Sequence, residues 1–331
     1  MRNVSWKKPI RILRPTKPDI FTPAFYFWNR APEKRVKILM NSETEPAANT
    51  LDYSVVKSYW KKADSSIMGP YMMEGFGFPA SAGRFRFRAE SGIVQQLIHK
   101  AKVDTTGAVL DLGSGVGYWA EFFALKFNKV IAVEASTPLY ETMARRCSSY
   151  DNFTAIHDDV LSFQPKGRFS LIFLGGLLMY LNEKDVVALL RKLQAFLAPG
   201  GIILCRESTV RNGTVTRDGD YQAVYRSVPT YLSLFNRCDL TGVKTCLNVP
   251  YILMQMGCEI VKKWKANVPG NLQMVSVVGH LAYWGLRLGN PWVTRIPSLM
   301  GIDFPELTNH FFLLCSGSQP HSSDKASPVN L

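Results

Sequence analysis

The sequence predicts an α/β fold that is built on a doubly wound, mostly parallel sheet, and two observations support this prediction. From about residue 92, short apolar runs typical of strands alternate with segments whose apolar residues recur at helical spacing. Glycine and proline mark several of the turns between them, as in the PGG at 199–201. Strands that alternate with helices indicate right-handed crossovers and a sheet covered on both faces. Ligands then bind at the carboxyl ends of the strands.

The expected elements follow one another in order. The predicted strands are 108–113, 129–136, 153–160, 169–181 and 201–208. The predicted helices are 92–102, 117–127, 138–150, 183–198 and 218–238. The last helix would carry Tyr221, Tyr225, Arg226 and Tyr231, with Tyr221 and Tyr225 on one face because they are four residues apart. This set is either a polar wall for the substrate or a tyrosine-bearing face of the core.

The composition indicates a folded protein with a marked positive charge. Hydrophobic residues make up 47% of the 331 residues, which fits one large or two small globular domains. The net charge is +13, and residues 1–40 hold ten Lys and Arg against two acids. This arm is either solvated or attracts an anionic partner such as a phosphorylated substrate, a nucleic acid or a membrane surface. Six scattered cysteines predict reduced thiols, a cytoplasmic location and no metal site.

Three glycines at alternate positions follow the first predicted strand. Gly113, Gly115 and Gly117 would let the backbone approach a ligand closely, beside the free N–H groups of a helix start. A dinucleotide site has G-x-G-x-x-G, but Tyr118 stands where the last glycine of that pattern would be. The carboxylate of Asp111 lies close to the turn and suits a cofactor that bears an ammonium group.

The segment DLGSGVG (111–117) resembles motif I of the class I S-adenosylmethionine-dependent methyltransferases, and later segments resemble this family in the same order. The resemblance implies a seven-stranded Rossmann-like sheet whose last strand, near 310–317, is antiparallel, and S-adenosylmethionine as cofactor. It implies that Glu134 binds the ribose hydroxyls and that Asp159 accepts from the adenine amine. The expected cofactor-binding residues are Trp60, Arg84, Asp111, Gly113, Ser114, Gly115, Gly117, Trp119, Glu134, Ala135, Asp159, Val160 and Gly175.

Residues 53–80 are similar to the protein α-N-terminal methyltransferases, which also have a Tyr-Trp-Lys triplet, here Tyr59 to Lys61, and then a Gly-aromatic-Gly turn. That group uses the tryptophan and a following arginine to enclose the methionine half of the cofactor. The alternation RFRFR (84–88) predicts a strand on which Arg84, Arg86 and Arg88 point the same way. The chain departs from the group where the group has a histidine base, because Met179 and Tyr180 stand there.

The methyl acceptor should face the end of the fourth predicted strand. The residues expected to line that mouth are Tyr180, Arg206, Glu207, Tyr225, Arg226 and Tyr231. The candidate catalytic residues are Glu207, Tyr180, Arg206 and Tyr225. Glu207 is either a base whose pKa is raised by burial or a structural partner of an arginine.

The functional hypothesis is methyl transfer to an O or N nucleophile of an anionic or membrane-associated small molecule, which includes lipid-linked acceptors. Methylation of a protein N-terminus or another macromolecule is one alternative, and a catalytically inactive cofactor-binding regulator is the other. Nucleic acid is disfavoured as a substrate because the chain lacks an Asp/Asn-Pro-Pro-aromatic motif.

The expected organisation has three parts. A basic extension (1–50) precedes a methyltransferase domain (51–317), and a flexible tail (318–331) follows it. The sixth strand is predicted at 257–268, so residues 269–308 form an insertion between the last two strands. This insertion is a cap on the sheet edge, a substrate lid, or a surface that docks on lipid or on a partner. Peripheral membrane contact is therefore part of the hypothesis, and the sequence predicts no oligomeric state.

Overall fold

The computed structural model describes residues 50–62, 76–240, 242–290, 292–300, 302 and 304–315. All of them belong to one compact unit, residues 45–331. The predicted basic extension, apart from Thr50, lies outside the described residues, and so do Gly75 and the predicted tail.

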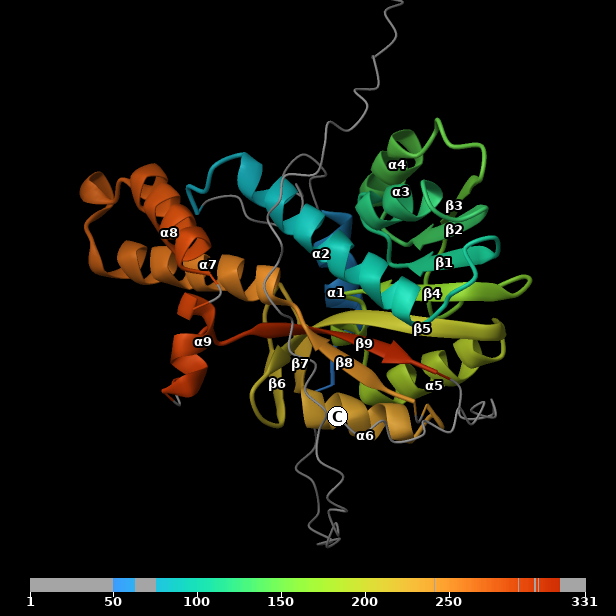
Figure 1. Cartoon of the computed structure of the whole chain (residues 1–331). Coiled ribbons are helices and arrows are strands. Elements are labelled where there is room, and N and C mark those ends of the chain that lie inside the picture. The colour runs from blue at the N-terminus through green and yellow to red at the C-terminus, as the bar shows by residue number, and fades with distance from the viewer. Residues whose placement is uncertain are drawn as a thin grey trace, which may run out of the picture. The chain divides into compact units, whose positions relative to one another are not determined.

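One nine-stranded sheet runs through the described residues (Figure 1). Its order is β3-β2-β1-β4-β5-β7-β6, and β9 pairs with both β5 and β8. The strands are β1 (Ala108–Leu112), β2 (Lys129–Glu134), β3 (Phe153–His157), β4 (Phe169–Gly175), β5 (Leu197–Val210), β6 (Thr214–Arg217), β7 (Ala223–Ser227), β8 (Lys244–Leu247) and β9 (Thr308–Leu314). β1 to β5 pair in parallel and β9 is antiparallel to β5, which confirms the predicted doubly wound sheet and its antiparallel last strand. The predicted number of seven strands is wrong, because β6 and β7 extend the sheet beyond β5.

Helices cover both faces of the sheet (Figure 1). The helices are α1 (Tyr53–Lys61), α2 (Ser81–Lys100), α3 (Tyr118–Ala124), α4 (Thr137–Arg146), α5 (Glu183–Gln194), α6 (Val228–Asn236), α7 (Val249–Asn267), α8 (Val275–Gly289) and α9 (Trp292–Leu299), with 3-10 turns η1 (Leu178–Tyr180) and η2 (Gly270–Leu272). Val109 packs with α2 and α3, whereas its neighbour Leu110 packs with α5 and α6. Alternate residues of a strand point to opposite faces, so two apolar layers form on one sheet.

Three predicted elements are wrong. Residues 257–268 belong to helix α7, which Asn248 caps by accepting from the Tyr251 N–H, and the sixth strand of the family pattern is β8 instead. The predicted helix 218–238 is strand β7 followed by α6. Every residue of β7 is buried, so it shows no apolar–polar alternation and its tyrosine spacing resembled that of a helix.

The RFRFR segment lies in helix α2 and forms no strand. Arg86 is therefore buried on the same face as Ala82 and Glu90, four residues away on either side. Arg84 and Arg88 are exposed.

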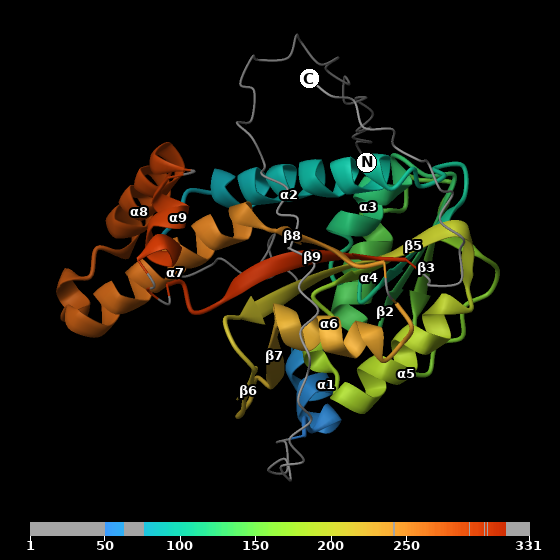
Figure 2. The same cartoon turned by 60° about the horizontal axis from the view of Figure 1, so that its bottom comes forward.

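Helices α7, α8 and α9 lie beside the sheet (Figures 1 and 2). The predicted insertion (269–308) contains α8 and α9, and because 257–268 is helical the segment between β8 and β9 also includes α7. α7 packs on α2 and β9, and α8 packs on α7. Their own core includes Leu253, Met256, Tyr283 and Leu286. Among the described helices, none has the length and apolar character needed to span a bilayer.

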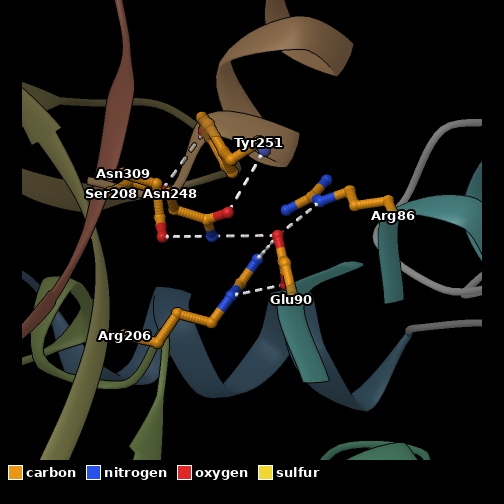
Figure 3. A network of polar contacts seen from close by, with 7 residues as sticks. All are labelled: Arg86, Glu90, Arg206, Ser208, Asn248, Tyr251 and Asn309. Atoms are coloured by element: carbon orange, nitrogen blue, oxygen red, sulfur yellow. Dashed lines mark hydrogen bonds and ion pairs between the residues drawn. The ribbon is translucent and has the colours of Figure 1, made fainter. Parts of the chain in front are cut away.

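The Glu90 carboxylate joins α2 to β5 and α7 (Figure 3). Arg206 of β5 donates to both carboxylate oxygens, Nε to Oε2 at 2.9 Å and Nη2 to Oε1 at 3.2 Å. Arg86 Nε and Asn248 Nδ2 each donate to Oε1 at 2.9 Å. Asn248 also donates to Oδ1 of Asn309 in β9 at 2.8 Å, so four elements meet at this network.

The two guanidinium groups determine the charge state of Glu90. Burial by itself would raise the pKa of this carboxyl, but Arg206 and Arg86 together lower it to about 2. The unfolded pKa is near 4.5, so the stabilisation is complete above that pH and is lost as the pH falls toward 2.

We expect Glu90→Gln to lower the free energy of unfolding by about 3–5 kcal/mol at pH 7, because it leaves two buried arginines without their carboxylate. The difference from the wild type should narrow as the pH falls below 4.5. Urea denaturation at several pH values measures both effects. Glu121→Gln is the matched control, since Glu121 forms a half-buried pair with Arg146 at 3.4 Å and should cost less than about 1 kcal/mol. Equal losses in the two variants would contradict the assignment.

Candidate active site

A cavity of about 850 Å³ lies at the carboxyl ends of the central strands. Asp111 from β1, Glu134 from β2, Gly175 from β4 and Arg206 from β5 line it. This is the position that the alternating strand–helix pattern predicts for a ligand. The predicted residues that line the cavity are Trp60, Asp111, Gly113, Ser114, Gly115, Trp119, Glu134, Ala135, Asp159, Val160, Gly175, Tyr180, Arg206 and Tyr225.

The glycine turn adopts the backbone that its sequence requires. Gly113, Gly115 and Gly117 have φ values of +69°, +56° and +85°, a region that side chains disfavour. A Cβ atom on Gly115 would meet nothing within 4 Å, so this residue leaves open space at the cavity wall. Gly117 is not among the lining residues, and a Cβ there would lie 2.9 Å from Cγ of Met143. Gly117 therefore permits helix packing, and its predicted ligand contact is not observed.

Two carboxylates lie at the ends of β1 and β2. Glu134 holds the glycine turn, because Oε2 accepts from the Gly115 N–H at 2.7 Å and Oε1 accepts from the Ser136 N–H at 2.9 Å. Asp111 is 1% exposed, and its Oδ2 has no hydrogen-bond partner. Burial raises the pKa of Asp111 to about 7, and the nearby charge of Glu134 adds to the rise. Buried polar atoms normally have a hydrogen-bond partner, so the Oδ2 atom of Asp111 is available to a cationic group of a ligand.

The end of β3 supplies the predicted adenine-side residue. Asp159 lines the cavity, where one carboxylate oxygen accepts from the Leu161 N–H at 2.9 Å. The other oxygen pairs with Lys57 of α1 at 2.8 Å. The Lys57 side chain is 58% exposed, so it can move away from Asp159 at little cost.

Helix α1 brings Trp60 to the cavity, and of the three arginines considered for the cofactor only Arg86 lines it. Arg84 is exposed and Arg86 lines the cavity in its place, because 84–88 is helical. Sequence reasoning missed Tyr59 and, on α7, Met254 and Lys262, which also line the cavity. The residues on α7 were missed because 257–268 was predicted to be a strand, so a helix that faces the cavity was not expected there.

Aromatic side chains form one wall of the cavity near the end of β4. The hydroxyl of Tyr221 lies 2.9 Å from that of Tyr180 and 3.1 Å from that of Tyr225. The Trp60 ring contacts the Tyr180 ring edge to face at 5.2 Å, and Tyr59 contacts Trp60 at 5.3 Å and Tyr221 at 5.0 Å. We call these five residues the aromatic wall, and all of them line the cavity.

Glu207 does not line the cavity, so its predicted position at the mouth is wrong. Its neighbour Arg206 faces the cavity, and consecutive residues of a strand point to opposite faces. Glu207 Oε1 accepts from the N–H groups of Leu177 and Leu178, at 3.1 and 3.0 Å, and thereby holds the turn that carries Tyr180. Burial raises the pKa of Glu207 to about 7. Arg226 and Tyr231, also expected at the mouth, do not line the cavity either.

Comparison with known proteins identifies the domain around the glycine turn. Residues 109–201 match the family described as "Methyltransferase domain". This segment contains β1 to β4, the glycine turn and both carboxylates. It is a class I S-adenosylmethionine-dependent methyltransferase domain. S-adenosylmethionine is its cofactor, as the sequence of the glycine turn and the nearby Asp111 led us to expect.

The relatives support the same conclusion over part of the chain. Over 162 residues the chain is 27% identical to a ribosomal RNA small subunit methyltransferase A from Dehalococcoides mccartyi, which covers 48% of this chain and 56% of the relative. It is 26% identical over 163 residues to phosphoethanolamine N-methyltransferase 1 from Arabidopsis thaliana, covering 48% of this chain and 33% of the relative. The chain thus spans about half the length, or less, of these curated relatives.

One solved structure resembles this chain over most of its length. A S-adenosylmethionine-dependent methyltransferase from Leishmania major superposes with a TM-score of 0.51 and 15% identity. The match covers 80% of this chain and 82% of that chain, and it confirms the Rossmann-like fold.

The residues of the cavity fit S-adenosylmethionine. Asp111 offers the buried carboxylate oxygen that the cofactor ammonium would pair with, and the open space at Gly115 admits the cofactor against the backbone. Glu134 retains lone pairs for the ribose hydroxyls after accepting from two N–H groups. The described residues contain no group of three His, Cys, Asp or Glu side chains that would hold a metal ion.

We expect the affinity for S-adenosylhomocysteine to fall roughly tenfold between pH 7.5 and pH 6. In the folded protein without cofactor, the pKa of Asp111 is about 7. Below that pH its carboxyl is mostly protonated and must lose a proton before it can pair with the cofactor ammonium group. Titration calorimetry in two buffers of different ionisation enthalpy should show the released proton. Asp111→Asn should bind more weakly and with little pH dependence. A wild type whose affinity is constant over this range would overturn the role of Asp111.

Glu207→Gln should retain the rate of methyl transfer within about tenfold, because the amide oxygen can accept from the same two N–H groups. Glu207→Ala should be slower than Glu207→Gln, since it leaves both buried N–H groups without an acceptor. The measurement is transfer from methyl-labelled cofactor to acceptors in a cell extract, with S-adenosylhomocysteine affinity as the control for folding. A loss of more than about 10² in Glu207→Gln, at unchanged affinity, would restore Glu207 as a general base.

Proposed function

We propose that this methyltransferase transfers a methyl group to the amine nitrogen of a small acceptor that also carries an anionic group. The observation that carries the proposal is the aromatic wall, which stands beside the end of β4 in the same cavity as Asp111. The bound cofactor supplies an activated methyl group, so the chain's own residues have to hold and orient the acceptor.

The aromatic wall favours nitrogen over oxygen as the nucleophile. An amine gains positive charge as it accepts a methyl group, and aromatic rings stabilise a nearby cation through their negative faces. An alkoxide loses its negative charge in the same step, so the rings would not favour its transition state. The interaction thus becomes stronger as the reaction proceeds, which is the condition for raising the rate.

The acceptor half of the cavity offers no carboxylate base among the described lining residues. Their acids lie at the ends of β1, β2 and β3, on the cofactor side: Asp111, Glu134, Asp158 and Asp159. Burial raises the pKa of Tyr180, Tyr221 and Tyr225, so these hydroxyls stay neutral and orient the acceptor by hydrogen bonds. A neutral amine attacks with its own lone pair, so the geometry suits an acceptor that needs no base at the moment of transfer.

Positive side chains supply the preference for an acceptor with an acidic group. Arg86, Arg206, Arg217 and Lys262, from α2, β5, β6 and α7, line the cavity. One of them would hold the cofactor carboxylate, and the others would attract a phosphate or carboxylate of the acceptor. The similarity to a phosphoethanolamine N-methyltransferase agrees with an amine that bears a phosphate.

Three matched compounds test the proposal. We expect label transfer from methyl-labelled S-adenosylmethionine to phosphoethanolamine, weaker transfer to ethanolamine, and none to the phosphate monoester of ethylene glycol. The third compound has the anion but a hydroxyl in place of the amine. Cell extracts treated with the same cofactor and analysed by mass spectrometry extend the test to larger acceptors. Label on oxygen, or label on no amine in either experiment, would overturn the proposal.

Two variants of Tyr221 distinguish the contribution of its ring to turnover from the contribution of its hydroxyl. Tyr221→Leu removes the ring and should lower the turnover by about tenfold, since a cation–π contact is worth roughly 0.5–2 kcal/mol. Tyr221→Phe keeps the ring and should lose only a few-fold. Both variants should bind S-adenosylhomocysteine as the wild type does.

A further inference from the structure

Helix α8 presents an apolar stripe to solvent. Val277, Leu281, Trp284 and Leu288 follow at intervals of four, three and four residues, which places them on one face. They are 50%, 69%, 44% and 82% exposed. The opposite face of α8 is buried, with Tyr283 and Leu286 in the core shared with α7. The helix is therefore apolar on two faces, and only one of them is covered within the described residues.

Helix α9, which contacts α8, repeats the pattern at the next step of the chain. Trp292, Ile296 and Leu299, spaced by four and three residues, are 77%, 48% and 83% exposed, and Met300 follows at 68%. These four residues and the four of α8 are called the α8–α9 surface below. An apolar surface of this extent on a water-soluble fold marks a site of interaction.

The segment that carries this surface has charge of one sign between Glu259 and Asp303. Between residues 260 and 302 the chain contains five Lys and Arg, and no Asp or Glu. Lys262, Lys263 and Lys265 are exposed at the end of α7, and Arg295 is exposed on α9. Trp264 is also exposed, so three tryptophans lie on this part of the molecule.

The positive charge of this segment favours an anionic membrane over another part of the same protein as the partner of the α8–α9 surface. A second copy of the chain would place its five cations opposite the same five cations, and the two copies would repel each other. Residues 1–40, with ten Lys and Arg against two acids, would repel the surface in the same way. An anionic bilayer complements the charge, and it takes up exposed leucine and tryptophan at the level of the lipid headgroups.

We propose that the α8–α9 surface docks on an anionic membrane, with α8 and α9 lying in the plane of the headgroups. Apolar stripes with flanking lysine, arginine and tryptophan are typical of helices that bind at this interface without crossing it. The surface is also connected to the cavity, because Met254, Cys258 and Lys262 of α7 line the cavity on the same helix that ends in Lys263 and Lys265. The docking proposal does not depend on which acceptor is methylated.

Co-sedimentation of the full chain with lipid vesicles tests the proposal. Vesicles of phosphatidylcholine alone are compared with vesicles of phosphatidylcholine and phosphatidylserine at roughly 3:1. We expect binding to the anionic vesicles only, with a blue shift of tryptophan fluorescence. Binding should weaken between about 50 and 500 mM salt without being abolished, because burial of apolar surface is not screened. Equal binding to both vesicle types, or to neither, would overturn the proposal.

Point variants locate the surface. The double variant Leu281→Glu/Leu288→Glu should lower vesicle affinity by at least tenfold at both salt concentrations and leave S-adenosylhomocysteine affinity unchanged. Leu125→Glu is the matched control. Leu125, which follows the last residue of α3, is 69% exposed like Leu281 but is not part of the α8–α9 surface. Similarly, Lys265→Glu/Arg295→Glu should weaken binding at low salt, whereas Lys166→Glu should not.

Two outcomes would assign the binding elsewhere. If the double leucine variant binds as the wild type does and both lose binding at 500 mM salt, the basic arm is responsible and the α8–α9 surface is not. If light scattering shows a wild-type dimer that the leucine variant dissociates, and vesicles do not bind, the surface joins two copies of the chain. Either result overturns the membrane proposal and leaves the cofactor site and the proposed acceptor untouched.

Discussion

The buried ion pair between Glu90 and the two arginines fixes the wall of the active site. Glu90 comes from α2, Arg206 from β5, and Asn248, which also contacts Glu90, caps α7. Without this carboxylate, Arg86 and Arg206 would be two like charges in a buried position beside the cavity. The network therefore does more than join helix to sheet. It holds two positive groups at the cavity wall and sets the point at which α7 begins.

The two halves of the cavity differ in charge because they come from different parts of the sheet. The acids lie at the ends of β1 to β3, whereas four cations of the lining come from α2, β5, β6 and α7. The aromatic wall comes from α1, η1, β7 and the turn before β7. Asp111 destabilises the free protein as the pH rises from about 4 to 7, since its folded pKa is raised to about 7 and it must ionise in a buried position. Pairing of Asp111 with a cofactor ammonium group would offset this cost and so couple folding to cofactor occupancy.

The sequence predicted the parts of the site that are local. DLGSGVG joins a strand, a turn and a helix within a few residues, and Glu134 ends the next strand, so their positions follow from the order of elements. The arginine of the cavity wall was harder to predict, because the choice of Arg86 over Arg84 depends on whether residues 84–88 form a helix or a strand. Glu207 was misplaced although the rule was available: Arg206 and Glu207 are consecutive in a strand and cannot both face one cavity. The aromatic wall needed tertiary structure, since Tyr59, Tyr180 and Tyr221 come from three separate segments.

Helix α7 relates the docking surface to the chemistry. It has 19 residues, so it is about 28 Å long at 1.5 Å per residue. Its first residues touch the Glu90 network, its middle residues line the cavity, and its last turns carry the lysines beside the α8–α9 surface. A membrane at that surface would therefore lie within one helix length of the methyl acceptor. An acceptor anchored in the bilayer would present its anionic group to a cavity wall that is already positive, and the same charge that attracts the membrane would favour its headgroups in the site.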